Sequence, residues 1–442
     1  ADQSRLSPVK GCAPPMQATG KSKQSMFQVL SGIWALLLGI VLIMLGNGMQ
    51  FTLIGLRGEI EGFSAQELAI ITSGYFVGFL LGARLTPLMI RRVGHVRVFA
   101  ALGSFMSAGL IAFTLLAEPW AWTVLRVLVG FCMSGIYVTA ESWLNDSATN
   151  QTRGKVLAAY MIAQTLGIIG AQGLLTLGDA GTAALFIGAS ILVSISFAPV
   201  LLSVNPVPAT EVAQPMSLRE LFSSSPLGTV GIFLVGSIYA TQSGLGAVYG
   251  TQIGVSVDEI ALFVAMLFAG ALLFQYPIGW LSDRMDRRRL IFGAAAFGAV
   301  SCALGWYSDE GLLPLLAAAF LAGGVTTPLY ALFLAYTNDF LSTEAMPAAS
   351  GGLVLTFGVG AISGPLVAGW LMDKLGPLAF WLVLGVTFGT IAIYALYRMT
   401  QRQAVPVDET ESYLSVLPTA SPVTVEAAGA WATEQANIKP ED

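Results

Sequence analysis

The chain of 442 residues is too apolar and too weakly charged for a water-soluble protein. Hydrophobic residues make up 55% of it and charged residues only 11%, with a mean hydropathy of +0.73, whereas soluble domains are about 25% charged. The formal net charge of −5 comes entirely from residues 403–442, which hold seven acids and one lysine, a net of −6, so that residues 1–402 sum to +1. The sequence has no basic patch of the kind that would indicate a nucleic-acid partner. The composition predicts an integral membrane protein.

The first segment, residues 1–29, is polar and contains prolines, and no apolar core precedes Leu30. We predict a disordered cytoplasmic lead-in rather than a cleavable signal peptide, which would need an apolar core of about 7–15 residues. Met26 is a candidate translation start near its end.

Twelve apolar stretches follow, each near the ~20 residues that a helix needs to cross a lipid bilayer. Strands of a membrane barrel would instead alternate in polarity over about 10 residues. We therefore predict an all-α integral membrane fold with twelve transmembrane helices. Their expected bounds are 30–54, 66–90, 97–117, 120–144, 155–177, 182–204, 226–250, 257–281, 289–308, 312–337, 346–372 and 376–399.

The longest interruption divides these spans six and six. Residues 205–225 hold three prolines and a serine run, which predicts a cytoplasmic linker between two six-helix bundles, residues 30–204 and 226–399. The acidic tail, residues 400–442, is rich in Ala, Pro, Thr and Glu. It offers too little apolar surface for a core, so we predict that it is disordered in the cytoplasm.

The distribution of Lys and Arg predicts the orientation. With both termini in the cytoplasm, 17 of the 21 basic residues are cytoplasmic, two (Arg57 and Lys374) are external, and two (Arg84 and Arg126) lie within spans. The opposite orientation would reverse the ratio and violate the positive-inside rule.

An internal repeat relates the two halves. Residues 62–69 (GFSAQELA) match residues 254–261 (GVSVDEIA) at an offset of 192. Six spans separate the copies, so the halves are parallel repeats of six helices. Offsets of 192 or 193 also pair Gly39 with Gly231, Gln50 with Gln242, Gly78 with Gly270, Tyr137 with Tyr330, and Asn145-Asp146 with Asn338-Asp339.

Three sequence motifs resemble those of the major facilitator superfamily. Residues 279–288 (GWLSDRMDRR) are similar to its G-x-x-x-D-R-x-G-R-R loop, with Asp286 at the second glycine position, while the equivalent residues 87–97 lack the aspartate. Residues 126–130 resemble its R-x-x-x-G motif, and residues 360–365 its antiporter Gly-Pro motif. Residues 138–142 and 153–161 further resemble the YcaD-like bacterial transporters. The resemblance implies the major facilitator fold in a bacterial inner membrane, and a central cavity lined by spans 1, 4, 7 and 10.

Span 4 holds two charges inside an apolar run. At 100° per residue, Arg126, Tyr137 and Glu141 fall on one stripe of about 60°. A charge in hydrocarbon costs about 2.5–3.5 kcal/mol on insertion scales, so it usually faces protein or a water-filled cavity. The two charges are either structural pins or part of a substrate pathway.

Counting residues at about 1.5 Å each places several polar side chains at one depth. Arg126 lies roughly 8 Å to the external side of the midplane, level with Asn47 and Gln50. The amide side chains either line the cavity or form hydrogen bonds that hold neighbouring helices together. The candidate substrate-binding residues are Arg126, Gln50, Gln242, Asn47, Tyr239, Tyr137, Tyr330 and Gln164.

Glu141 lies about 14 Å toward the cytoplasm, which suits an inner-gate partner for Arg84 better than a proton carrier at the midplane. Proton coupling through Glu141 remains an alternative. Asp146 and Asp339 are repeat partners placed to pair with the basic loops. The candidate gating or coupling residues are Glu141, Arg84, Asp283, Arg284, Asp146 and Asp339.

The rest of the sequence shows no pattern of metal-binding or catalytic residues. Three scattered cysteines (Cys12, Cys132, Cys302) and one histidine (His95, in a basic loop) give no metal-ligand spacing. We expect no cofactor and no metal, and no cluster of catalytic side chains within the spans suggests an enzyme.

We therefore predict a monomeric secondary active transporter that moves a small organic solute by alternating access, with Arg126 favouring an anionic one. The alternatives are a proton-coupled exporter of amphipathic compounds, which the Gly-Pro motif supports, and a transporter-like receptor or scaffold that transports nothing. A receptor or scaffold would not need the polar residues that the spans retain.

Overall fold

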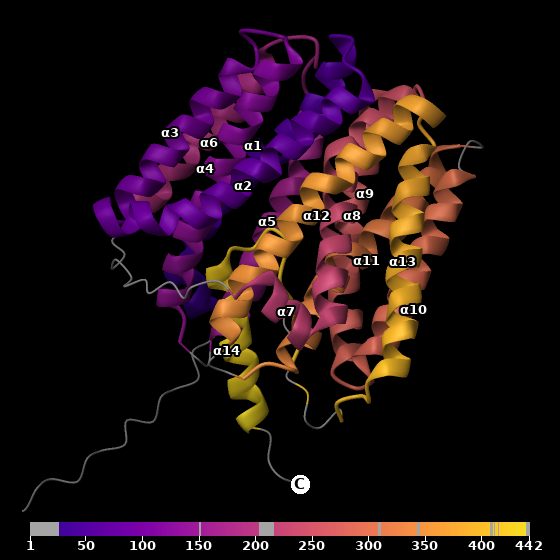
Figure 1. The fold of residues 1–442 in the computed structure, drawn as a ribbon. Helices are drawn as coiled ribbons and strands as arrows, with labels where there is room; N and C mark the ends of the chain where they lie inside the picture. The colour runs from indigo at the N-terminus through magenta and orange to yellow at the C-terminus, as the bar shows by residue number, and fades with distance from the viewer. Residues whose placement is uncertain are drawn as a thin grey trace, which may run out of the picture.

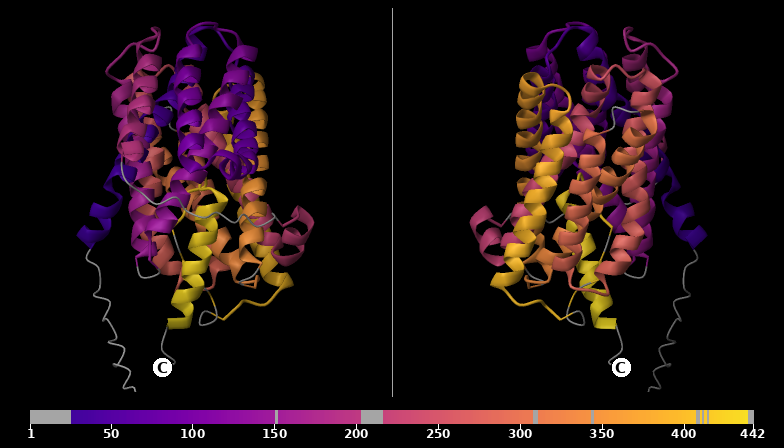
Figure 2. Two further views of the ribbon diagram at one scale, coloured as in Figure 1. Left: turned by 90° about the vertical axis from the view of Figure 1, so that its left-hand side faces the viewer. Right: turned by 90° about the vertical axis from the view of Figure 1, so that its right-hand side faces the viewer.

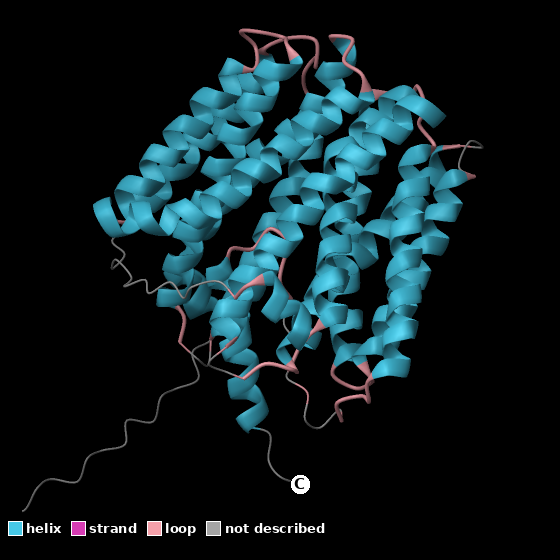
Figure 3. Cartoon of the chain, viewed as in Figure 1, coloured by secondary structure: helices cyan, strands magenta, loops and turns pink. Residues whose placement is uncertain are grey.

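The computed structural model describes residues 26–149, 152–202, 216–307, 311–342, 345–406, 410, 412–413 and 415–438. Helices account for the regular structure of this part of the chain (Figure 3). Their bounds are α1 Met26–Ile60, α2 Ala65–Val93, α3 His95–Ala112, α4 Pro119–Ser147, α5 Arg153–Leu175, α6 Ala184–Leu202, α7 Leu218–Ser224, α8 Pro226–Gln252, α9 Val257–Ser282, α10 Arg287–Trp306, α11 Leu312–Asn338, α12 Met346–Leu375, α13 Ala379–Gln401 and α14 Pro422–Ile438.

Twelve of the described helices, α1 to α6 and α8 to α13, are long and apolar enough to cross a membrane. They confirm the twelve predicted spans, although several are longer than predicted. The predicted lead-in lies outside the described residues up to residue 25, and residues 26–29 already belong to α1. His95 was expected in a loop but begins α3, because Gly94 at φ 86° turns the chain within a single residue.

The internal repeat has a structural cause at two equivalent turns. Gly62 and Gly254 adopt positive φ values of 82° and 77° before α2 and α9. Ser64 and Ser256 then cap these helices, and Glu67 and Glu259 complete a capping box in each. Glycine followed by Ser-x-x-Glu therefore recurs because both halves begin their second helix in the same way.

Glycines let the helices of each half approach closely. A Cβ on Gly78 of α2 would lie 1.9 Å from the carbonyl oxygen of Val127 in α4, and one on its repeat partner Gly270 of α9 would lie 2.0 Å from that of Phe320 in α11. Backbones this close exclude any larger residue. The pairs α2–α4 and α9–α11 are thus equivalent contacts in the two halves (Figure 1).

The start of α1 and helix α14 lie at the same end of the bundle, which we call the tail end; the loops that begin α2 and α9 lie at the opposite, far end (Figures 1 and 2). At the far end the halves are bound together. Asp373 of α12 accepts hydrogen bonds from the N–H groups of Ala65 (3.0 Å) and Gln66 (3.2 Å) at the start of α2. Gln252 of α8 donates to Glu59 of α1 at 3.1 Å. The far end is therefore closed.

Two segments predicted to be irregular contain helices. Of the predicted linker, residues 205–215 lie outside the described part, but α7 follows, capped by Ser217. The prediction of a wholly disordered tail is wrong for residues 415–438, which include α14 and several buried side chains. The composition of the tail does not support a core of its own, but here it packs against the transmembrane helices.

Candidate functional site

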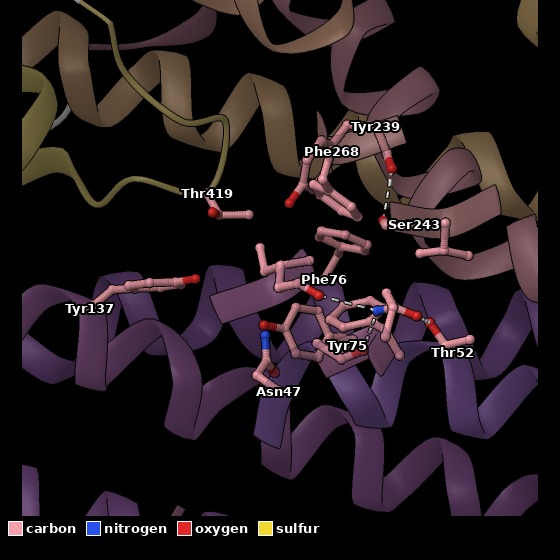
Figure 4. Close-up of a pocket in the computed structure, with 14 residues that line it drawn as sticks. Asn47, Thr52, Tyr75, Phe76, Tyr137, Tyr239, Ser243, Phe268 and Thr419 are labelled. Atoms are coloured by element: carbon pink, nitrogen blue, oxygen red, sulfur yellow. Dashed lines mark hydrogen bonds between the residues drawn. The ribbon is translucent and has the colours of Figure 1, made fainter. Parts of the chain in front are cut away.

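A cavity lies between the two halves of the bundle. Side chains of α1, α2, α4 and α5 face Tyr239 and Phe268 of α8 and α9 across it, and Thr419 of the tail enters from one side (Figure 4). About 30 Å³ remains for the centres of water molecules, room for a few waters but not for an organic solute. The cavity is lined by Asn47, Gly48, Phe51, Thr52, Tyr75, Phe76, Tyr137, Ile168, Gln172, Tyr239, Ser243, Val264, Phe268 and Thr419.

Three of the predicted substrate-binding residues line this cavity: Asn47, Tyr137 and Tyr239. The Tyr137 hydroxyl donates to the sulfur of Met44 at 3.3 Å. Asn47 accepts a hydrogen bond of 3.0 Å from Gln50, one turn further along α1, which is fully buried and not among the lining residues. Gln50 therefore orients Asn47 rather than facing the cavity itself.

Arg126 lies behind the cavity wall. Its guanidinium carbon is 4.2 Å from the ring centre of Phe51 and 4.7 Å from that of Tyr75, and both rings line the cavity. The side chain is 1% exposed, and its Nε and Nη1 have no hydrogen-bond partner among the described residues. Two aromatic rings therefore separate Arg126 from the open space.

Gln242 lies on the other side, in α8. Its Oε1 accepts a hydrogen bond of 3.0 Å from Thr326 of α11, while its Nε2 has no partner among the described residues. It lines a smaller adjacent cavity, which shares Tyr239 and Phe268 with the central one. The repeat partners Gln50 and Gln242 thus occupy comparable positions, with one unpartnered amide atom each.

The remaining two candidates are buried away from the central cavity. Tyr330 of α11 packs edge-on against Phe357 of α12, with ring centres 5.5 Å apart, and its hydroxyl has no partner among the described residues. Gln164 of α5 is 2% exposed and is not among the lining residues. In this conformation both residues are packing residues between helices.

Glu141 is buried nearer the tail end, and its partners differ from the expected one. Its Oε1 accepts a hydrogen bond from the hydroxyl of Tyr160 at 2.8 Å, and its Oε2 accepts one from the backbone N–H of Ser421 at 2.9 Å. Arg84, the predicted gate partner, is exposed on α2. That pairing is wrong for this conformation, because Arg84 lies on a different face of α2 from the interior.

The motif loop of the second half forms a buried charge cluster. Arg287, 3% exposed, makes an ion pair with Asp339 and donates to the Ala335 carbonyl at 3.2 Å. This pairing of Asp339 with the basic loop was predicted. Asp283 accepts from the backbone N–H of Tyr413 at 2.8 Å. Arg284 stacks on Trp280 of its own helix turn, with the guanidinium carbon 4.3 Å from the ring centre.

Asp146, the repeat partner of Asp339, is exposed at the end of α4. It has no ion pair within 4.0 Å among the described residues, unlike Asp339. The predicted symmetry of the two aspartates therefore fails, and the loop between α2 and α3 lacks the aspartate of the second-half loop.

Several lining residues were not predicted. Phe51 and Tyr75 separate Arg126 from the cavity, and Gln172 of α5 accepts a hydrogen bond of 2.9 Å from Thr52 of α1. Phenylalanines and tyrosines occur throughout the spans, so nothing in their spacing singles these out. Thr419 was missed because the tail was expected to be disordered.

Relatives of this chain are membrane transporters. The family model described as Major Facilitator Superfamily matches residues 36–256 and 229–432. The MFS-type transporter YcaD of Escherichia coli (strain IAI39 / ExPEC) is 27% identical over 363 residues, which is 80% of this chain and 93% of that protein. The MFS-type transporter YfkF of Bacillus subtilis (strain 168) is 24% identical over 355 residues, 78% of this chain and 90% of that protein.

Solved structures show the same fold. A mutant form of the nucleoside transporter NupG superposes with a TM-score of 0.73 at 14% identity, covering 83% of this chain and 99% of that one. A bacterial homologue of the human lysosomal transporter Spinster, in an inward-facing and unoccupied conformation, gives a TM-score of 0.64 at 14% identity, covering 92% and 98%. With twelve membrane-length helices in two repeats around a central cavity, this chain belongs to the Major Facilitator Superfamily and is a multi-pass secondary transporter of a small molecule, not an enzyme.

Proposed function

We propose that the protein transports a small organic solute with an anionic group through the central cavity by alternating access. It acts as a monomer in a bacterial inner membrane, with both termini in the cytoplasm. The supporting observation is Arg126, a buried cation with no ion-pair partner among the described residues.

The energetics of Arg126 favour an external counter-ion. Leaving a buried charge unpaired costs several kcal/mol, and cation–π contacts with two rings return about 2 kcal/mol each when desolvated. A substrate carboxylate or phosphate that displaces Phe51 or Tyr75 would form charge-assisted hydrogen bonds with the guanidinium, whose Nε and Nη1 have no partner among the described residues. Asn47 and Tyr239 would then contact the rest of the solute.

A second candidate function is proton-coupled export of amphipathic compounds, and Glu141 is the observation that favours it. This carboxyl is 1% exposed, has no basic partner within 4.0 Å among the described residues, and lies beside Tyr160. A buried carboxyl without a cation can change protonation as its surroundings open and close. In that case the aromatic lining would receive apolar rings of the solute.

Ligand binding by the purified protein distinguishes transport of an anionic solute from proton-coupled export of amphipathic compounds. A thermal-shift panel would compare carboxylates and phosphate monoesters with neutral amides of the same shape and with amphipathic amines. Stabilisation by anions that Arg126→Gln removes supports the first function. Stabilisation by amines that persists in Arg126→Gln, but not in Glu141→Gln, would overturn it in favour of the second.

A further inference from the structure

The tail occupies the space between the two halves at the tail end of the bundle. Its residues 415–421 form a loop between the halves, with a turn in which the Ala420 N–H donates to the Leu417 carbonyl at 3.0 Å. Helix α14 follows, packed on α4 and α5 of the first half and α12 of the second (Figures 1 and 2). Many of its side chains are buried to a degree typical of a protein core: Val416, Thr419, Ala420, Ser421, Thr424, Val425, Ala427 and Ala428 are all at most 8% exposed.

One anchor fixes the tail to the second half. The backbone N–H of Tyr413 donates to Oδ1 of Asp283 at 2.8 Å. The ring of Tyr413 rests on Gly279 of α9, where a Cβ would lie 2.6 Å from the ring. Both residues belong to the GWLSDR sequence, residues 279–284, of the motif loop, so the tail contacts that loop directly.

A second anchor fixes the tail to the first half. The Ser421 N–H donates to Glu141 at 2.9 Å, and the hydroxyls of Ser421 and Thr424 also face this carboxyl. Pro422 begins α14 directly after Ser421. The positive end of the helix dipole is therefore directed at the buried carboxylate, which is the favourable arrangement for a negative charge.

Between the anchors the tail reaches the substrate pathway. Thr419 lines the central cavity with Asn47 and Tyr239. Leu417 lines an adjacent cavity with Thr165 of α5 and Gln275 of α9, at the contact between the halves. The small volume left in the central cavity is thus partly a consequence of the tail.

Helix α14 packs closely against the bundle because glycines lie at two of its contacts. The ring of Trp431 lies over Gly154 at the start of α5, where a Cβ would lie 2.9 Å from it. On the other face, Gly429 lies near Asn338 of α11 and Met346 of α12. Residues 412–431 carry a single ionisable acid, Glu426, whereas the other six acids of the tail lie outside this stretch.

We propose that the cleft between the two halves is a binding site for a nearly uncharged peptide that forms a loop and a helix, and that its ligand is the protein's own segment 412–431. The segment touches both halves while the far end is closed, so it holds the transporter in this conformation and blocks the substrate pathway. The halves can close at the tail end only after the segment leaves. The blocking role rests on the proposed transport through the central cavity; the docking itself does not.

Thiol labelling tests docking without knowledge of the substrate. In a chain with its three cysteines replaced by alanine, Thr165→Cys lies behind Leu417. We expect a hydrophilic maleimide to label it at least about tenfold faster in a chain that ends at Val405 than in the full-length protein. Ser223→Cys, exposed on α7, is the control position and should react equally in both proteins. Equal labelling of Thr165→Cys in both would overturn the proposal.

Single substitutions keep the test decisive if the shortened chain fails to fold, and an added peptide gives a further test if it does fold. Ser421→Pro removes the N–H that binds Glu141, and we expect fast labelling; the matched Ser421→Ala retains the N–H and should stay protected. A synthetic peptide of residues 412–431 added to the shortened chain should restore protection, and a scrambled peptide should not. If the shortened chain or Ser421→Pro labels fast but transports at the rate of the full-length protein, only the blocking role is contradicted. Slow labelling of Thr165→Cys in the Ser421→Pro variant would contradict the docking.

Discussion

The backbone N–H of Ser421 and the carboxyl of Glu141 are joined by a hydrogen bond of 2.9 Å across 280 residues of sequence. Glu141 therefore has one partner that can leave it, the tail, and one that stays, Tyr160, whose helix belongs to the same half. Once the tail has left, the carboxyl faces the opened cleft with a single hydroxyl partner. Its protonation would then depend on the conformation of the transporter.

We expect Glu141→Gln to transport at a rate that no longer varies with pH while substrate exchange across the membrane persists. Glutamine keeps the volume and one acceptor oxygen but cannot lose a proton. The measurement is counterflow and gradient-driven uptake in proteoliposomes between pH 5.5 and 8. An unchanged pH profile in the variant would remove Glu141 from the coupling mechanism.

Glu426 of α14 predicts a pH dependence for tail docking. Burial against the bundle raises the pKa of this carboxyl above its ordinary value, so the docked state binds the proton more tightly than the free tail does. Docking is then strongest at pH values below the ordinary carboxyl pKa and weakens as the pH rises through the docked-state pKa. Glu426→Gln should remove this dependence. The labelling rate of Thr165→Cys, divided by that of Ser223→Cys at each pH, measures the effect; a flat ratio in the unsubstituted tail would contradict it.

Local signals made most of the fold predictable. Apolar stretches of membrane-spanning length predicted the twelve spans. The Gly-x-Ser-x-x-Glu repeat predicted two turns, because the residues that cap each helix are neighbours in the sequence. Gly78 and Gly270 matched in sequence because equivalent helix pairs leave no space for a side chain at either position. The spans and the capped turns depend on residues within one or two helical turns, and the glycine pair is visible because the two halves repeat it.

The site was less predictable because it depends on how distant helices are rotated. Counting residues along a helix predicts a depth for Arg126, but it cannot show that Phe51 and Tyr75 stand between Arg126 and the cavity. The tail was predicted to be disordered because its composition cannot form a core. Val425 and Ala428 are buried by a cleft made of other helices, which composition alone does not reveal.

We expect Arg126→Ala to lose transport of an anionic solute at least about a hundredfold, because a charge-assisted pair with a desolvated substrate group contributes about 3 kcal/mol or more. Arg126→Lys should retain a small part of it, since lysine keeps the charge but not the planar fork. Uptake by proteoliposomes with matched protein content measures the effect. Normal uptake by Arg126→Ala would exclude this residue from the substrate site.

Asp286 stands where the motif usually has glycine, and its role is local. Its carboxyl caps α10 by accepting from the Arg288 N–H at 2.9 Å and also binds the Arg288 guanidinium at 2.8 Å. Burial alone would raise the pKa of Asp286, but the hydrogen bonds and charge of Arg288 outweigh it and lower the pKa. The stabilisation is thus present at neutral pH and lost as the pH falls through the lowered pKa.

We expect Asp286→Ala to destabilise the purified protein by about 1 kcal/mol, the usual cost of a lost N-cap, and Asp286→Asn to lose less because the amide oxygen can still accept. Thermal unfolding in detergent at pH 7 measures both. The difference between Asp286→Ala and the unsubstituted protein should shrink at pH values below the carboxyl pKa; a difference that stays constant would contradict the capping role.

The contact between α2 and α4 gives a test of the packing within one half. Gly130 of α4 and Gly78 of α2 form a reciprocal close contact, since a Cβ on Gly130 would lie 2.0 Å from the carbonyl oxygen of Tyr75. Alanine at Gly78 must push the helices apart, at the cost of about 1–3 kcal/mol that overpacking usually brings.

Gly173→Ala in α5 is the control, because a Cβ there meets no atom within 4 Å. We therefore expect a lower Tm for Gly78→Ala and an unchanged or slightly higher one for Gly173→Ala, as alanine favours a helix. Equal Tm values for the two variants would mean that α2 and α4 are further apart than in this structure.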